Sequence, residues 1–319
     1  MIKKYGIPAL VILVLVGISL SNIIRVDGDT HTAAYKGSTL CKMCHQNTHK
    51  ELVEAYLKTG HPKAFQKADA EGAIVADFSS NPVFTKDKVA YVLGKGIKQQ
   101  AFLDANLQVL PAIWDVKTKK WKPTQAVDGA TQCIGCHVTG YNAETKAYVE
   151  AGVGCESCHG PGGDHVSNAT AKGSILKLTE LPRDRQTMIC GGCHSKGKDL
   201  SGKFAFPIGF KPGDDLAKFF VDAKPTTPGL NQQYSEHITS THYTKLTMTC
   251  TTCHDPHNQS GIAHELRKPV NEQCLGCHAA KIKDMATHAP NAAADATCAT
   301  CHMPYGEHIF KKLEKKEGS

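Results

Sequence analysis

Residues 152–165 read GVGCESCHGPGGDH. Two cysteines, two histidines and five glycines share these 14 positions, and Val153 is the one aliphatic side chain among them. Glycine permits tight turns and a close approach of the backbone to a neighbouring group. A segment of this composition has almost nothing with which to build a hydrophobic core. We therefore expect it to fold around something other than side chains.

A motif inside this stretch repeats along the chain. The pattern Cys-x-x-Cys-His occurs seven times and uses all 14 cysteines of the 319 residues. In chain order, the first to seventh motifs are Cys41-Cys44-His45, Cys133-Cys136-His137, Cys155-Cys158-His159, Cys190-Cys193-His194, Cys250-Cys253-His254, Cys274-Cys277-His278 and Cys298-Cys301-His302. A disulfide framework needs no histidine after every second cysteine, and zinc sites normally combine two such pairs for each metal. The pattern is instead that of covalent haem c attachment.

Each motif supplies the groups that one haem c needs. The two thiols can reach the two vinyl groups on one porphyrin edge, and the adjacent histidine then places an imidazole nitrogen on the iron. We therefore predict seven haems c, bound covalently through the 14 motif cysteines. The histidine that ends each motif is the predicted proximal iron ligand.

The other histidines are candidates for the second axial position. Of the 17 histidines, seven lie in motifs and ten do not. Methionine is the main alternative ligand. Of the six methionines, Met1 begins the chain, Met43 lies inside a motif, and Met248 and Met303 lie close to one, which leaves Met188 and Met285. Most irons are therefore predicted to have two histidine ligands. The favoured distal ligands are His61, His165, His242, His257, His288 and His308. His49, His237 and His264 are held for the seventh place, and His31, near the export segment, is the least favoured.

Two of these histidines lie very close to a motif in sequence. His49 follows His45 by four residues, and His257 follows His254 by three. On a helix or a tight turn, these spacings point both side chains to the same side. Such a histidine cannot reach the far face of its own haem. If either binds iron, we expect the iron to belong to a neighbouring haem.

The N-terminal segment predicts export. Lys3 and Lys4 precede an apolar run from Ile7 to Leu20, as in a secretory signal. Apolar character continues to Arg25, about 20 residues from Tyr5 and long enough to span a bilayer. Residues 1–25 are predicted as a signal peptide or, with residues 5–24 retained, an inner-membrane anchor. In both cases the haem-bearing part is periplasmic or otherwise extracytoplasmic.

The charge of the chain must be considered together with its cofactors. The formal net charge is +7 at pH 7, and five of these charges remain without Lys3 and Lys4 of the export segment. Each haem brings two propionates against a ferric core, so seven oxidised haems add about −7. The loaded protein is then negative. Its basic residues are better explained as propionate partners than as a nucleic-acid surface, and we exclude nucleic acid as a partner.

The motif spacing suggests how the chain is organised. The first two motifs are 92 residues apart, whereas later motifs follow at intervals of 22 to 60. We predict an N-terminal haem segment at 36–130, with a small β-meander near residues 83–122. A six-haem segment at 131–319 continues it as one haem-cored domain. Aromatic residues make up only 7% of the chain, so the haems themselves are expected to be the core.

Several stretches resemble a known class. They are CIGCHVTGYNAETKAYVEAGVGCESCHGPGGDH, ICGGCHSKGKD followed by FAFPIGFKPGDDL, THYTKLTMTCTTCHDPH, and CATCHMP with a later histidine. They resemble multihaem c-type cytochromes of the class that includes the tetrahaem electron acceptor of hydroxylamine oxidoreductase, over roughly residues 36–308. The resemblance implies a fold of mainly α-helix and irregular loops wrapped around haems stacked in parallel and perpendicular pairs. It also implies electron transfer and supports the six favoured distal histidines. Seven motifs instead of four is a departure from the tetrahaem pattern.

Two functions remain open from the sequence. The first is extracytoplasmic electron transfer through seven haems, with redox partners such as a membrane quinol-oxidising complex or outer-membrane cytochromes, or with further copies of this chain. The alternative is a multihaem oxidoreductase of the nitrite, hydroxylamine or tetrathionate type, which needs one iron with an open position beside proton-donating groups. All seven motifs end in histidine, and three histidines are surplus to seven iron pairs. Both observations favour the electron carrier.

Overall fold

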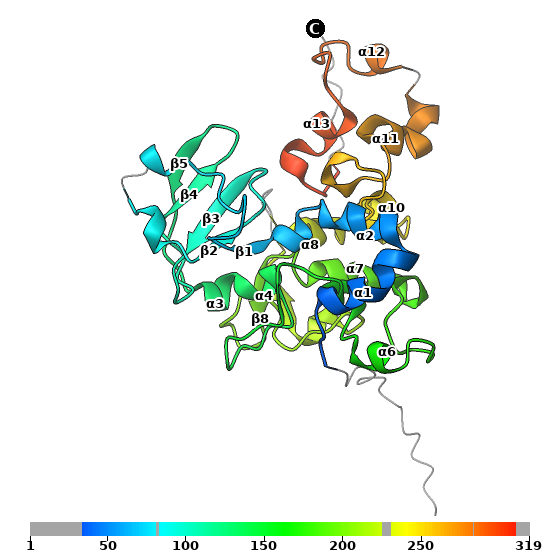
Figure 1. The fold of residues 1–319 in the computed structure, drawn as a ribbon. Helices are drawn as coiled ribbons and strands as arrows, with labels where there is room; N and C mark the ends of the chain where they lie inside the picture. The colour runs from blue at the N-terminus through cyan, green and yellow to red at the C-terminus, as the bar shows by residue number, and fades with distance from the viewer. Residues whose placement is uncertain (1–33, 81–82, 225–230, 283, 311–319) are drawn as a thin grey trace, which may run out of the picture. The chain divides into compact units, whose positions relative to one another are not determined.

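The structure is a computed structural model and describes residues 34–80, 83–224, 231–282 and 284–310 (Figure 1). The signal or anchor predicted at residues 1–25 lies outside these ranges, as does His31. Within them, no helix is long and apolar enough to cross a membrane. The boundary predicted at residue 130 stays a prediction.

Short helices carry the motifs. The α-helices are α1 (Ser38–Thr48), α2 (Lys50–Leu57), α3 (Gly129–Gln132), α4 (Ile134–His137), α5 (Glu156–His159), α6 (Gly163–Ser167), α7 (Arg183–Gly191), α8 (Gln233–His237), α9 (Thr241–Thr244), α10 (Cys250–Cys253), α11 (Val270–His278), α12 (Met285–His288) and α13 (Cys298–His302). The 3-10 turns are η1 (His61–Lys63), η2 (Phe78–Ser80), η3 (Lys86–Lys88), η4 (Leu178–Glu180), η5 (Leu216–Lys218), η6 (Ala263–Glu265), η7 (Ala279–Lys281) and η8 (Pro304–Gly306). Each motif contains or adjoins one helical turn. Such a turn brings residues three and four apart to the same side, as attachment to one haem edge requires.

The predicted β-meander is present and larger than expected. Its strands are β1 (Phe65–Lys67), β2 (Tyr91–Leu93), β3 (Gln99–Leu103), β4 (Ala112–Asp115) and β5 (Lys120–Pro123), paired antiparallel in sequence order. The sequence missed β1, because it has three residues and follows η1 directly. Two small hairpin sheets were also not predicted: β6 (Val138–Thr139) with β7 (Glu150–Ala151), and β8 (Gly197–Asp199) with β9 (Phe220–Asp222).

The five-stranded sheet has a hydrophobic core of its own. Neighbouring residues of β3 alternate between two clusters, since Leu103 packs with Phe65 and Ile134, while Phe102 packs with Trp114. This alternation follows from the period of two in a strand. Ile134 belongs to the second motif, so the first cluster joins the sheet to a haem-attachment helix.

A buried carboxylate joins the segment before the first motif to the third motif. Glu156 is 1% exposed and accepts hydrogen bonds from the backbone N–H groups of Lys36, Gly37 and Gly162, at 2.6 to 3.0 Å. Ser38 adds a contact, since its Oγ accepts from the Cys155 N–H at 2.9 Å. Segments about 120 residues apart in sequence are held together in this way.

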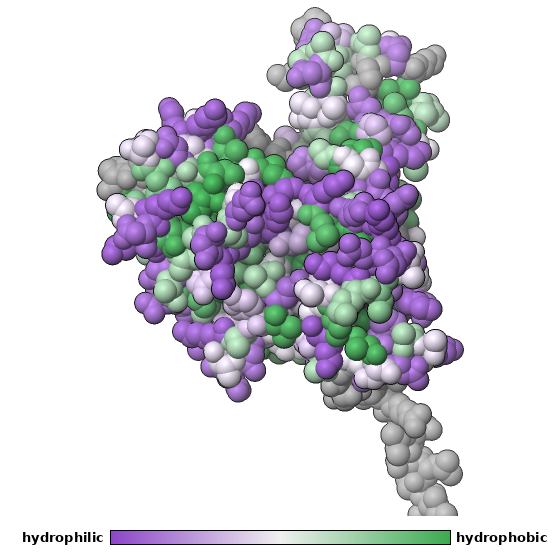
Figure 2. Space-filling model, in the orientation of Figure 1, coloured by the Kyte–Doolittle hydropathy of each residue, from purple (hydrophilic) through white to green (hydrophobic). Residues whose placement is uncertain are grey.

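Large exposed hydrophobic side chains are dispersed over several elements. Met43, Ile97, Leu200 and Val221 are each more than half exposed and lie on different elements or turns. Figure 2 shows hydrophobic residues interspersed with hydrophilic ones on the visible face. Scattered exposed residues of this kind are ordinary for a protein surface.

Candidate haem-binding sites

The motif cysteines are available for covalent attachment. All 14 lie in the described ranges and none forms a disulfide. Most are partly buried, whereas Cys44, Cys277 and Cys301 are exposed. The exposed thiols belong to the first, sixth and seventh motifs, so the attachment edges of these sites face solvent more than the others do.

Six motif histidines lie opposite a histidine from elsewhere in the chain. The ring centroids are 5.9 to 6.3 Å apart in the pairs His45–His165, His61–His194, His159–His257, His242–His278, His254–His308 and His288–His302. Two imidazoles that share one metal have centroids roughly 6 Å apart, because each metal–nitrogen bond is about 2 Å. The spacing therefore leaves room for one iron in each pair. The six partners are the six favoured distal histidines, and their binding to iron stays a prediction.

These pairs connect distant parts of the chain. His61 lies between the first two motifs in sequence but faces His194 of the fourth. His257 follows His254 of the fifth motif but faces His159 of the third, at 6.2 Å. This is the neighbour relation that its spacing predicts. An iron in such a pair would tie together segments that are far apart in sequence.

The second ring nitrogen of several motif histidines is occupied. Nδ1 lies 2.9 Å from the Ala64 carbonyl in His137 and 3.1 Å from the Leu176 carbonyl in His159. Nδ1 of His254 lies 2.9 Å from the His264 carbonyl. A carbonyl can only accept, so Nδ1 carries the proton and donates. The lone pair of Nε2 is then left for a metal, and the imidazole is oriented as metal-bound histidines commonly are.

Burial favours the neutral form of several candidate ligands. Burial is the largest cause that lowers the pKa values of His61, His137 and His254. Burial, and then the neighbouring His254, lowers the pKa of His308 to about 4. Iron binds the neutral imidazole. The environment therefore favours the form that a haem site requires.

Within the described ranges, His137 of the second motif has no such partner. Among the ring contacts of the described residues, none places a second imidazole against it. His49 instead stacks on His45 at 5.4 Å. His237 uses Nε2 to donate to the Met248 carbonyl at 3.1 Å. His264 is exposed and contributes its backbone carbonyl to His254. Among the described ring contacts, none of the three histidines held for a seventh distal place therefore faces His137.

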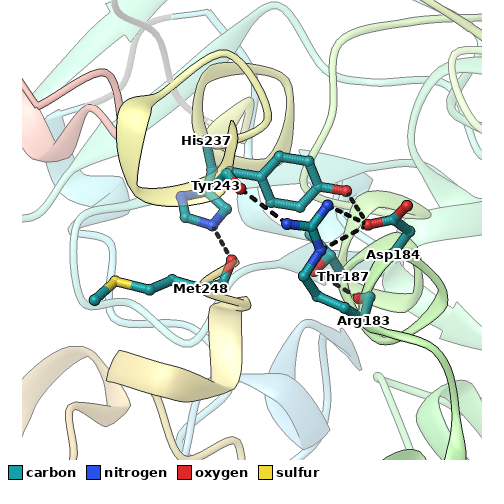
Figure 3. A network of polar contacts seen from close by, with 6 residues as sticks. All are labelled: Arg183, Asp184, Thr187, His237, Tyr243 and Met248. Carbon is teal, nitrogen blue, oxygen red and sulfur yellow. Dashed lines mark hydrogen bonds and ion pairs between the residues drawn. The ribbon is translucent and has the colours of Figure 1, made fainter. Parts of the chain in front are cut away.

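A polar network joins α7 to the segment that enters the fifth motif (Figure 3). Arg183 donates from Nη1 to the Tyr243 carbonyl at 2.9 Å and lies over the Tyr243 ring, 4.3 Å from its centroid. The Tyr243 hydroxyl donates to Asp184 at 2.8 Å. This hydrogen bond, and then Arg183, lower the pKa of Asp184. The network fixes α9, which carries His242, and His237 holds the backbone at Met248.

Thiols of different motifs lie beside one another, and these contacts shift the pKa values of the thiols. The Cys41 and Cys155 thiols share a hydrogen bond, which raises the pKa of Cys41 and lowers the pKa of Cys155 to about 6. The Cys136 thiol likewise raises the pKa of Cys193. The attachment points of the first and third motifs are therefore adjacent, as are those of the second and fourth.

Two further thiol contacts involve the later motifs. The Cys190 thiol raises the pKa of Cys250 through a hydrogen bond. Burial, followed by the neighbouring Cys298, raises the pKa of Cys274 to about 11. The fourth and fifth motifs are therefore adjacent, as are the sixth and seventh.

Weaker electrostatic influences connect the remaining neighbours. Burial and then Cys190 and Cys193 raise the pKa of Cys158 to about 12. Burial and then Cys277 raise the pKa of Cys253. The third motif thus lies near the fourth, and the fifth lies near the sixth.

Comparisons with known proteins agree with these sites. The family described as "Cytochrome c554 and c-prime" matches residues 109–160, and a doubled CXXCH motif matches residues 244–283. Cytochrome c-554 of Nitrosomonas europaea is 28% identical in an alignment 179 residues long that covers 51% of this chain and 58% of that protein. The multihaem cytochrome MtrA of Shewanella baltica is 29% identical in an alignment 180 residues long that covers 48% of this chain and 54% of that protein. The chain is a multihaem c-type cytochrome. Its resemblance to this class, predicted from the sequence, is confirmed.

A third relative of this cytochrome is an enzyme by name. The dissimilatory sulfite reductase MccA of Wolinella succinogenes is 31% identical in an alignment 186 residues long that covers 50% of this chain and 23% of that protein. The chain thus spans between 23% and 58% of the length of these relatives.

Solved structures share the fold of this cytochrome. The outer cell wall cytochrome OcwA superposes with a TM-score of 0.69 at 22% identity, covering 87% of this chain and 79% of that one. The undecahaem cytochrome from the S-layer of Carboxydothermus ferrireducens gives a TM-score of 0.56 at 22% identity, covering 88% and 52%. The fold is therefore a multihaem cytochrome fold with short helices and small antiparallel sheets. The Cys-x-x-Cys-His motifs imply haem c as the cofactor.

Proposed function

We propose that this cytochrome conducts single electrons outside the cytoplasm through seven covalently bound haems c. The observation that carries the proposal is the adjacency of thiols from different motifs. Each thiol attaches to one edge of its haem, so adjacent thiols mean adjacent haem edges. Bound haem supplies one-electron redox chemistry, whose potential depends on axial ligands, burial and hydrogen bonds.

The adjacencies define an order. The first motif neighbours the third, which lies near the fourth, and the fourth neighbours the fifth. The fifth lies near the sixth, and the sixth neighbours the seventh. The second motif neighbours the fourth. We therefore propose a line through the first, third, fourth, fifth, sixth and seventh haems, with the second haem as a side branch at the fourth.

The two ends of this line are suited to exchange with partners. Cys44 of the first motif is exposed at one end, as is Cys301 of the seventh motif at the other, next to the exposed Cys277 of the sixth. We propose redox proteins as the partners, among them a quinol-oxidising membrane complex, outer-membrane cytochromes or a second copy of this chain. The motif type, the N-terminal sequence and the cell wall and S-layer titles of two similar structures support an extracytoplasmic location.

The test is a haem count combined with low-temperature electron paramagnetic resonance of the oxidised protein. The intact mass and the haem absorbance per polypeptide should give seven haems, and the spectrum should contain low-spin signals from six irons. Fewer than six low-spin haems, or a high-spin signal from several irons, would contradict the conduit.

A second candidate function rests on His137. Among the described residues no second imidazole faces it, which supports an iron with an open position at the second motif. We propose reduction or oxidation of a small nitrogen or sulfur substrate there, of the nitrite, hydroxylamine or tetrathionate type. The partial likeness to a sulfite reductase adds sulfite to these substrates. The fourth haem would exchange electrons with this side branch.

The second candidate has its own test. One high-spin ferric signal should be present and should change when nitrite or sulfite is added. It should vanish in the double variant Cys133→Ala, Cys136→Ala and persist in the matched variant Cys298→Ala, Cys301→Ala. A spectrum without any high-spin signal would remove this candidate and leave the conduit.

A further inference from the structure

His242 differs from the other favoured distal histidines at its second nitrogen. Nδ1 of His242 is shielded from solvent and has no hydrogen-bond partner in the described part of the chain. Two other favoured distal histidines have a partner there, since Nδ1 of His308 lies 3.0 Å from the Gly306 carbonyl and Nδ1 of His165 lies 3.2 Å from the Ser174 hydroxyl. Nδ1 of His237 is also buried without a partner, but the Nε2 of His237 donates to the Met248 carbonyl. Among the six favoured distal histidines in the described ranges, only His242 combines a buried Nδ1 with no partner.

An aromatic ring covers the His242 imidazole. The Phe310 ring centroid lies 4.2 Å from that of His242, with the planes tilted by 52°. The ring centroid of His278 in the sixth motif lies 6.1 Å from that of His242. Phenylalanine offers no conventional hydrogen-bond acceptor. Because the Nδ1 atom is also out of reach of solvent, water does not replace the missing acceptor.

The place of His242 is nevertheless well determined. Its neighbour Tyr243 is fixed by Arg183 and Asp184 (Figure 3). The His242 carbonyl accepts from the Met248 N–H at 3.1 Å. The His242 imidazole is thus positioned through the backbone of α9. In His308 and His165, by contrast, the hydrogen bond at Nδ1 both orients the imidazole and affects its basicity.

The missing hydrogen bond has an electronic consequence. A hydrogen bond from Nδ1 to an acceptor makes an imidazole a more basic ligand, and a more basic ligand stabilises ferric over ferrous iron. We propose that His242 tunes the sixth haem: it binds the iron as an imidazole without an acceptor at Nδ1 and so raises the reduction potential of that haem. This inference rests on the proposed electron-transfer function. Electrons that arrive through the fifth haem would then be held at the sixth before they reach the seventh.

The test supplies an acceptor next to His242. Phe310→Asn places a side-chain carbonyl near Nδ1 of His242. Phe310→Leu is the control, because leucine has the shape of asparagine but offers no hydrogen-bond acceptor. In a redox titration of the haem-loaded full chain, one haem should have a lower reduction potential in Phe310→Asn than in Phe310→Leu. The equilibrium constant between its reduced and oxidised forms should shift about tenfold toward the oxidised form. This change is about 59 mV for a one-electron couple. His242→Met assigns the step, because a methionine ligand moves the potential of the same haem upward.

Phe310 also lies near His308, with ring centroids 5.9 Å apart. The Nδ1 of His308 already has the Gly306 carbonyl as partner, so the fifth haem should keep its potential in both variants. Equal titration curves for Phe310→Asn and Phe310→Leu would overturn the inference. It would also be overturned if the two variants differed in the potential of a haem that His242→Met does not affect. The haem count and the low-spin spectrum of each variant separate this outcome from a failure of the proposed function.

Discussion

The region of the five-stranded sheet and the region that carries the last three motifs are built differently. The sheet buries side chains such as Phe65, Val92 and Phe102, each at most 1% exposed. After Tyr234, no hydrophobic side chain in the described part of the chain is buried, although the fifth, sixth and seventh motifs follow. The first region has a core of side chains, and the second has histidine pairs with space between them. We therefore expect bound haems to supply the interior of the second region, whereas side chains supply the interior of the first.

The largest expected effect comes from removal of a haem in the second region. We expect the double variant Cys274→Ala, Cys277→Ala to lose protection from hydrogen exchange over residues 250–282 and 284–310, because no buried hydrophobic cluster remains to hold them. The matched variant Cys133→Ala, Cys136→Ala should keep protection in the sheet, since Ile134 still packs there. If residues after 250 kept their protection from hydrogen exchange without the sixth haem, the region of the last three motifs would not depend on haem for its stability.

The next effect concerns the core of the sheet. Phe102 is 0% exposed, so Phe102→Ala should cost about 3–5 kcal/mol of local stability. Ile97 is 62% exposed on a turn beside β3, and Ile97→Ala should change stability by less than about 0.5 kcal/mol. Hydrogen exchange of the β2–β4 amides measures both. The redox titration should stay unchanged for the fifth to seventh haems, and a shift there would show that the two regions are not independent.

A smaller effect is expected at the buried carboxylate of Glu156. Glu156→Gln replaces an acceptor of several backbone N–H groups and should cost about 2 kcal/mol. The control is Glu180→Gln, whose ion pair with Lys177 is about two-thirds exposed on both sides and should contribute under about 0.5 kcal/mol. Limited proteolysis near residue 36 reports the opening. Equal cleavage in the two variants would mean that the Glu156 hydrogen bonds do not hold the first motif against the third.

The smallest effect is a pH dependence of the network between α7 and α9. Tyr243 and Arg183 lower the pKa of Asp184 below its usual value, so its stabilising effect is complete above about pH 4 and is lost as the pH falls through the lowered pKa. The Asp184 side chain is 53% exposed, which limits the effect to under about 1 kcal/mol. The urea midpoint should fall less with acidification in Asp184→Asn than in the parent protein. An equal fall would exclude this carboxylate as the cause.

Local pattern predicted much of this molecule. The motifs fix their own helical turns, because covalent attachment requires cysteine and histidine on one side. The alternation from Tyr91 to Pro123 predicts the meander, but β1 is too short for a periodic signal. The six histidines named from the sequence face motif histidines in the structure.

What depends on tertiary contact was not predictable. Which histidine faces which motif and the order of the thiols both arise from segments far apart in sequence. The same holds for the finding that no described histidine faces His137. The role of Glu156 was missed as well, although a carboxylate inside a haem motif is a signal that could have directed attention to it. Its partners, Lys36 and Gly37, are backbone groups, which leave no trace in the side-chain pattern.

The most direct measurement is a structure of the haem-loaded protein at a resolution that shows each iron and its ligands. The account predicts iron between the histidines of all six pairs and haem edges adjacent in the order first, third, fourth, fifth, sixth and seventh, with the second beside the fourth. Irons bound by other histidines, or a wide gap within this order, would contradict it.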